Sequence, residues 1–216
     1  MTPHLLGFHP NQMQLSYAIL IDGGFLKHKI GSAKVPMTAD AVRQFVLQLQ
    51  RSPELSDMRL HRTYYYDAYP SSEVVKKPLN GGVLDFGKSS AYARNRKLFS
   101  DLAVQPFMAM RMGEVVQNGW KVSHKLLNSP ADTVELTAEH IQPAIGQKGV
   151  DMRIGLDIAS LTLKRQVQVI VLVTGDSDFV PAMKFARKEG AQLFLVTLGH
   201  GIKDSMREHA DLLINL

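Results

Sequence analysis

The chain has 216 residues, of which 45% are hydrophobic and 21% charged, as in an ordinary globular protein large enough to bury its own core. It contains no cysteine, which excludes disulfide frameworks and zinc–thiolate sites, and no apolar run approaches the ~20 residues that cross a bilayer. The net charge of +5 favours a polyanionic partner over a cationic one, although a merely solvated basic surface would show the same excess.

The beginning of the chain, residues 1–16, lacks the basic start and continuous apolar core of a signal peptide. We therefore expect an N-terminal arm over residues 1–16 and a single domain over residues 17–216. The lack of cysteine fits a reducing compartment, so we expect a cytoplasmic protein that does not associate with membranes.

Short apolar runs alternate with amphipathic segments through the rest of the chain. The runs predict strands, and three of them are nearly continuous in Val, Ile and Leu, as expected of strands covered on both faces. The predicted strands are 17–21, 59–66, 168–173, 192–196 and 211–215, and the predicted helices are 38–49, 91–102, 152–163, 179–188 and 203–209. This alternation predicts a parallel α/β sheet with helices on both sides.

Three segments need separate treatment. Residues 70–87 are rich in Pro, Gly, Ser and Lys and predict a long exposed loop. Around residues 107–123, Asn118-Gly119 lies between two apolar-containing runs and predicts a β-hairpin that projects from the body. Residues 150–158 fit a strand as well as a helix, and we favour a helix because the apolar pattern continues to Leu163.

Aspartates follow the first three predicted strands. Asp22 follows the first strand and Asp67 the second. Asp176 and Asp178 follow the third strand across a Thr-Gly turn, and Asp151 lies at the start of the helix before it. Ligands of open α/β sheets bind at the carboxyl ends of the strands, so these acids are expected to share one edge. Hard oxygen donors without a His or Cys partner are typical of Mg²⁺ or Mn²⁺ sites.

Each acid also has a purely structural interpretation. Asp178 would suit the cap of the following helix, because Pro181 belongs in a first turn, but a cap leaves Asp176 unexplained. Asp22 and Asp67 are also ordinary turn residues, and Asp151 suits a helix N-terminus.

Three further residues are weaker candidates for the same site. They are Asp67, Asp157 and Lys148. Asp157 ranks low because six residues separate it from Asp151, which turns it far round the helix. Lys148 is either solvated or positioned to meet a phosphate.

Several longer stretches resemble one family. They are "AILIDGGFL", "YYYDA", "QKGVDMRIGLDI", "VLVTGDSDFVPAMKFARKEG" and "IKDSMREHADLLINL". Together they resemble the NYN domain family, in the LabA-like branch of the PIN-like ribonucleases. The resemblance implies a PIN-like three-layer α/β/α sandwich with a mainly parallel central sheet. It places the family's catalytic and metal-binding acids on Asp22, Asp151, Asp176 and Asp178, and it implies RNA cleavage that depends on Mg²⁺ or Mn²⁺.

One position departs from the family's pattern. Many relatives carry Asn shortly after the first acid, where this chain has Phe25 in "DGGF". We expect a metal-dependent ribonuclease, and the alternative is a non-catalytic nucleic-acid-binding or regulatory module that retains the acidic pocket. A dinucleotide-binding fold is disfavoured because "DGGFLKHKIG" lacks the G-x-G-x-x-G spacing.

The basic surplus is expected to hold the substrate. The candidates are Lys76 and Lys77 in the predicted loop, Lys88 just beyond it, and Arg94, Arg96 and Lys97 in "ARNRK". RNA is the expected partner, while the sequence leaves single-stranded DNA and homo-oligomerisation open.

Overall fold

The computed structural model describes residues 14–32 and 34–216. Most of the predicted N-terminal arm therefore lies outside the described residues, and its last position, Ser16, already belongs to the first strand. Each of the predicted strands and helices is present within a few residues of its expected bounds.

The central sheet has seven strands in the order β6-β5-β2-β1-β7-β8-β9. They are β1 (Ser16–Asp22), β2 (Arg59–Tyr69), β5 (Met108–Val122), β6 (Ile141–Lys148), β7 (Val169–Val173), β8 (Gln192–Val196) and β9 (Leu212–Ile214). Neighbouring strands are parallel except for the antiparallel pair β5 and β6. The predicted mainly parallel sheet is confirmed.

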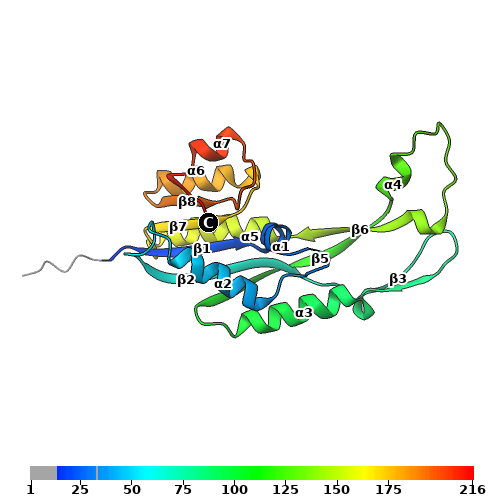
Figure 1. The fold of residues 1–216 in the computed structure, drawn as a ribbon, viewed down its shortest axis with the longest axis horizontal. Helices are drawn as coiled ribbons and strands as arrows, with labels where there is room; N and C mark the ends of the chain where they lie inside the picture. The colour runs from blue at the N-terminus through cyan, green and yellow to red at the C-terminus, as the bar shows by residue number, and fades with distance from the viewer. Residues whose placement is uncertain (1–13, 33) are drawn as a thin grey trace, which may run out of the picture.

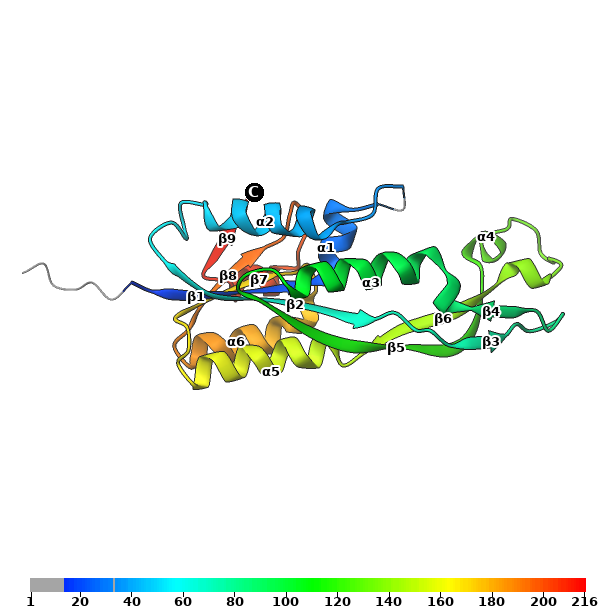
Figure 2. The same cartoon turned by 90° about the horizontal axis from the view of Figure 1, so that it is seen from below.

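Helices cover both faces of this sheet, as Figure 2 shows. One layer contains α1 (Gly23–Ile30), α2 (Ala39–Gln50) and α3 (Ser90–Ala103), and the other contains α5 (Val150–Leu163), α6 (Val180–Lys188) and α7 (Asp204–Glu208). Alternate residues of β1 feed the two cores: Ile19 and Ile21 pack with the first layer, and Ala18 and Leu20 with the second. Burial on both faces explains why residues 17–21 of β1 and all of β7 are apolar.

The starts of α1 and α2 differ in how well the sequence indicates them. Thr38 accepts a hydrogen bond from the backbone N–H of Ala41 and so caps the start of α2. Helix α1 was not predicted, because it opens on Gly23-Gly24 and has a weak apolar stripe. Among the described residues, no helix is long and apolar enough to cross a membrane.

An arm projects beyond the carboxyl edge of the sheet (Figure 1). We use "the arm" for residues 115–147, which are the outer part of β5 and β6 with their connection, together with the β3–β4 pair. It is distinct from the predicted N-terminal arm. Strands β3 (Val74–Lys76) and β4 (Val83–Asp85) form a separate antiparallel sheet, followed by the 3-10 helix η1 (Phe86–Lys88). The predicted loop 70–87 therefore contains a short hairpin of its own.

The predicted turn at Asn118-Gly119 is wrong. Strand β5 continues through this dipeptide with an irregularity in its pairing, and Gly119 has φ +79°. The antiparallel partner β6 returns only after α4 (His124–Leu127) and the 3-10 helix η2 (Ala138–His140). An Asn-Gly pair supplies the positive φ of a bulge as readily as that of a turn, which is why the local pattern was misleading.

The strand order reverses between β1 and β7. From β1 the sheet extends through β2 and β5, and from β7 it extends in the opposite direction through β8 and β9. The chain segments that leave the carboxyl ends of β1 and β7 therefore diverge onto opposite faces, since α1 lies in one helical layer and α6 in the other. This reversal is where open α/β sheets place their ligands.

Candidate functional site at the carboxyl ends of β1 and β7

Asp22 is the last residue of β1 and also the N-cap of α1. One oxygen, Oδ1, accepts a hydrogen bond from the backbone N–H of Phe25 at 3.0 Å. The other, Oδ2, accepts a hydrogen bond from the Thr174 hydroxyl at 3.2 Å. Thr174 follows β7 directly and is fully buried, so two central strands jointly fix the Asp22 carboxylate.

The same threonine also orders the segment that carries the next two acids. Its Oγ1 accepts a hydrogen bond from the backbone N–H of Asp176 at 3.2 Å, and Asp176 Oδ1 accepts one from the backbone N–H of Asp178 at 2.9 Å. Asp176 is thus the cap of the 3-10 helix η3 (Ser177–Phe179). The N-cap of α6 is Phe179, and the Asp178 side chain does not cap this helix. The Asp178 carboxylate is therefore exposed.

Asp151 lies in the first turn of α5, which starts immediately after β6. The approach of β6 to β5 is very close here: a Cβ on Gly113 would lie 2.5 Å from the carbonyl oxygen of Lys148. Gly149 then turns the chain with φ +76° into the helix. These two glycines bring the start of α5 to the carboxyl edge of the sheet.

The acids influence one another electrostatically. Burial raises the pKa of the Asp22 carboxyl, the charge of Asp151 raises it further, and the hydrogen bonds from Phe25 and Thr174 oppose the rise. Burial also raises the pKa of Asp151, and the negative charges of Asp176 and Asp178 add to this effect. A shared region of negative potential therefore connects all four aspartates.

The donor set suits a hard divalent cation. Four carboxylates supply oxygen ligands, and no ion pair within residues 14–32 and 34–216 neutralises any of them. Among the described residues, however, no group of three or more His, Asp or Glu side chains is placed to hold a metal ion, so the four carboxylates do not form a metal site in this arrangement. The metal site predicted from the sequence therefore stays a prediction, supported by ligand chemistry and by charge.

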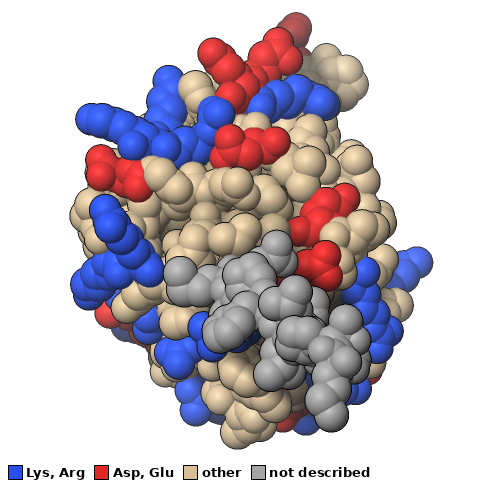
Figure 3. Space-filling view, turned by 90° about the vertical axis from the view of Figure 1, so that its left-hand side faces the viewer, with Lys and Arg blue, Asp and Glu red and all other residues tan. Residues whose placement is uncertain are grey.

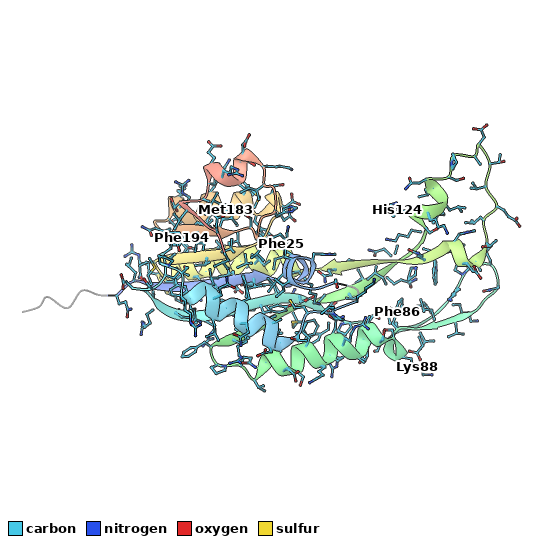
Figure 4. All side chains as sticks on the ribbon, viewed as in Figure 1. Phe25, Phe86, Lys88, His124, Met183 and Phe194 are labelled. Carbon is cyan, nitrogen blue, oxygen red and sulfur yellow. The ribbon has the colours of Figure 1, made fainter. Side chains whose placement is uncertain are left out.

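An aromatic and basic rim borders the acids. Phe25 lies at the end of the body that faces the arm (Figure 4), and its ring meets His200 edge-on with centroids 5.8 Å apart. A Cβ on Gly175 would lie 2.4 Å from the His200 ring and 2.8 Å from that of Phe25, so only glycine fits between them. Lys203 donates a hydrogen bond at 2.9 Å to Ser177, between Asp176 and Asp178 in the chain.

Asp67 does not join the four aspartates as a free ligand. It is 1% exposed, and its Oδ2 lies 2.7 Å from the Lys27 ammonium and accepts a hydrogen bond from the Tyr65 hydroxyl. Its Oδ1 accepts hydrogen bonds from the Ala68 backbone N–H and from the Gln147 amide. Asp67 differs from the four aspartates because the Lys27 ammonium neutralises its charge, so its carboxylate serves here as a structural anchor. Its assignment as an additional ligand stays a prediction.

Asp157 is also engaged elsewhere. Its Oδ2 accepts hydrogen bonds from the Tyr66 hydroxyl at 2.8 Å and from the Arg111 guanidinium at 2.9 Å. These contacts are to β2 and β5, so the Asp157 carboxylate is directed toward the sheet, in keeping with its low rank as a ligand. Lys148 is exposed at the end of β6, three residues before Asp151, so both interpretations, a solvated lysine and a phosphate contact, stay open.

The predicted nucleic-acid contacts divide between the arm and α3. Lys76 and Lys77 belong to the β3–β4 hairpin, and Lys88 ends η1 at the base of the arm (Figure 4), 3.4 Å from Asp85. The others, Arg94, Arg96 and Lys97, lie on α3. The opposite end of the body mixes Lys and Arg with Asp and Glu (Figure 3).

Sequence reasoning missed Thr174 and Lys27. Thr174 stands in the quoted motif, and its position directly after a buried strand and before the acids was the available signal. Lys27 had no such signal, because its partner Asp67 comes 40 residues later and only the fold joins them.

Three comparisons with known proteins bear on this site. The sequence profile described as the NYN domain matches residues 16–216. An uncharacterized protein of Methanocaldococcus jannaschii is 27% identical over 75 residues, a stretch that covers 35% of this chain and only 31% of that protein. A crystal structure of a protein of unknown function from Vibrio parahaemolyticus superposes with a TM-score of 0.52 at 11% identity, covering 95% of this chain and 94% of that one. The last similarity shows the fold alone.

Proposed function

Because the chain belongs to the NYN domain family, a PIN-like nuclease family, we propose that it is a metal-dependent ribonuclease that hydrolyses RNA phosphodiester bonds. One observation carries the proposal: Thr174 ties Asp22 and Asp176 together where the strand order reverses. The motifs "KGVD" and "GDSDF" further support a place in the LabA-like branch.

We assign Asp22, Asp151, Asp176 and Asp178 to the binding of Mg²⁺ or Mn²⁺. When bound, such an ion lowers the pKa of a water molecule and stabilises negative charge on a reacting phosphate. The protein's part is to hold carboxylates that repel one another. Thr174 holds the Asp22 carboxylate and the backbone of Asp176 through hydrogen bonds, and the turn at Gly149 brings Asp151 to the same edge.

Positively charged side chains near this edge would orient the substrate. Lys148 precedes Asp151 by three residues, and Lys203 touches the segment between Asp176 and Asp178. The arm leaves from the same edge of the sheet (Figure 1), and we propose that its lysines extend this contact along a strand of nucleic acid.

The direct test is to titrate the purified protein with Mn²⁺ in the presence of labelled single-stranded RNA and, separately, of DNA of the same sequence. We expect cleavage of RNA that rises with Mn²⁺ and stops when a chelator is added. RNA that remains intact at every Mn²⁺ concentration would contradict the proposal.

A second function keeps the acidic pocket but not the activity: a nucleic-acid-binding or regulatory module. Phe25 favours it, because an aromatic ring occupies the place of the family's usual Asn beside the acids. In that case divalent metal would still raise the melting temperature, by a stabilisation of ~2.7 kcal/mol at a hundredfold excess over the dissociation constant. The wild type would show this shift and Asp22→Asn/Asp178→Asn would not, yet neither protein would cleave RNA.

A further inference from the structure

A cavity of about 400 Å³ opens between α1 and α3, beside the proposed metal site. Gly24 contributes to its wall, and a Cβ on Gly24 would lie 3.3 Å from Asp22 Oδ1, so the cavity and the first acid are direct neighbours. Its volume falls in the range of small-ligand sites, ~300–1,000 Å³. The proposed metal chemistry makes no use of this space.

The floor of the cavity is polar but electrically balanced. Lys27 and Asp67 form an ion pair there at 2.7 Å, and Lys27 also donates a hydrogen bond at 2.7 Å to Asn95. The Lys27 ammonium lies 4.9 Å from the centre of the Phe99 ring as well. A lysine held on three sides is a fixed part of the wall, and because Asp67 cancels its charge, the floor does not suit an isolated phosphate.

The remaining walls combine apolar faces with hydrogen-bonding edges. Pro36, Met37 and Leu98 supply the apolar surface, and Gln147 and Arg94 supply polar groups. The Gln147 amide gives one hydrogen to Asp67, while its carbonyl oxygen has no hydrogen-bond partner among the described residues. An amide edge that offers an acceptor next to a donor pairs with the edge of a nucleobase.

We propose that this cavity binds one unstacked nucleobase of the nucleic-acid substrate, next to the phosphate that meets the acids. A flat heterocycle with apolar faces and a polar edge matches a cavity lined by Pro36, Met37 and Leu98 together with Gln147. Lys148 follows Gln147 in β6 and precedes Asp151, so one short segment links the base subsite to the acids. This inference rests on the proposed function, from which it takes the class of substrate.

The test measures binding, so that it does not depend on cleavage. Single-stranded RNA oligonucleotides, each with one abasic nucleotide at a successive position, are titrated against the wild type in the presence of a chelator. We expect an abasic nucleotide to weaken binding by about tenfold at one position and little at the others.

The matched variants are Arg94→Gln/Gln147→Leu, which alters the cavity wall, and Gln142→Leu, which changes an exposed glutamine on the same strand. The first should bind intact RNA about tenfold more weakly and lose its sensitivity to the abasic position. The second should behave as the wild type. Melting temperatures of both variants check that the fold is kept.

Two outcomes would overturn the base subsite. Abasic nucleotides might matter equally at all positions, or the cavity variant might weaken intact and abasic RNA by the same factor, which indicates contact with phosphate alone. Either result leaves the ribonuclease proposal standing if Mn²⁺-dependent cleavage is observed. Conversely, a position-specific abasic effect without cleavage supports the subsite and contradicts the catalytic proposal.

Discussion

The hydroxyl of Thr174 is hydrogen-bonded to Asp22 Oδ2, 3.2 Å away, and joins the ends of β1 and β7 beneath the acids. The same oxygen accepts the backbone N–H of Asp176. One buried side chain therefore contacts both the carboxylate of Asp22 and the backbone of Asp176, two acids that are 154 residues apart in the chain.

Replacing Thr174 should loosen this arrangement. Thr174→Val keeps the shape of the side chain but removes both hydrogen bonds, which should lower the free energy of unfolding by about 2 kcal/mol. It should also reduce the increase in RNA cleavage that Mn²⁺ causes. Thr174→Ser retains the hydroxyl and should stay close to the wild type in both respects. Thermal melting and Mn²⁺-dependent cleavage measure the two effects, and equal Mn²⁺ responses in the two variants would show that the hydroxyl is not needed.

The buried pair of Asp67 and Lys27 should matter for stability. Asp67→Ala leaves the Lys27 ammonium without its carboxylate in a largely buried position, which should cost about 3 kcal/mol in denaturant unfolding. The exposed pair of Lys97 and Asp101 provides the control, because Asp101→Ala should change stability by less than ~1 kcal/mol. Similar losses in the two variants would mean that Asp67 is not the anchor that its four contacts indicate.

Without metal, the acids should destabilise the fold at neutral pH. The pKa values of Asp22 and Asp151 are raised in the folded state, so the folded protein binds more protons than the unfolded chain between the ordinary and the raised values. In a chelator, the free energy of unfolding should therefore increase as the pH falls through this window. Asp151→Asn should be more stable than the wild type at pH 7, and this advantage should shrink on acidification. An advantage that is constant with pH would show that charge repulsion is not its cause.

The sequence predicted the framework of the fold better than its edges. The runs that form the middle of β1, β7 and β8 are apolar because both faces of the sheet are covered, and this signal is local. Strands β5 and β6 are half-exposed and mixed in composition, so only their pairing with each other and with β2 makes them recognisable.

In the candidate site, too, the sequence predicted the local features and missed those that depend on contacts between distant segments. The positions of Asp22, Asp176 and Asp178 after strands follow from the sequence, since parallel strands end at one edge. The engagement of Asp67 with Lys27 and Gln147 depends on contacts between distant segments. Sequence alone therefore selected the candidate acids but did not distinguish Asp67, which is paired with Lys27, from the four that have no ion pair among the described residues.

The arm should contribute to binding through charge. Lys76→Gln, Lys77→Gln and Lys88→Gln together should weaken RNA binding for all sequences alike and reduce the slope of log affinity against log salt by about 2. The control replaces Lys164, Lys184 and Lys188 with Gln, which removes the same charge from exposed positions on and next to α5 and α6. If both triple variants change the slope equally, the net charge and not the arm attracts the substrate.

The most direct test of the account is the rate at which Asp176→Asn cleaves single-stranded RNA in saturating Mn²⁺, measured beside the wild type. The substitution removes one negative charge and keeps an oxygen that accepts the hydrogen bond of Asp178, so the variant should fold normally. We predict that the wild type cleaves the RNA and that Asp176→Asn loses this activity while its melting temperature in a chelator is unchanged or higher. Cleavage by Asp176→Asn at the wild-type rate would contradict the assignment of the aspartates as the catalytic site.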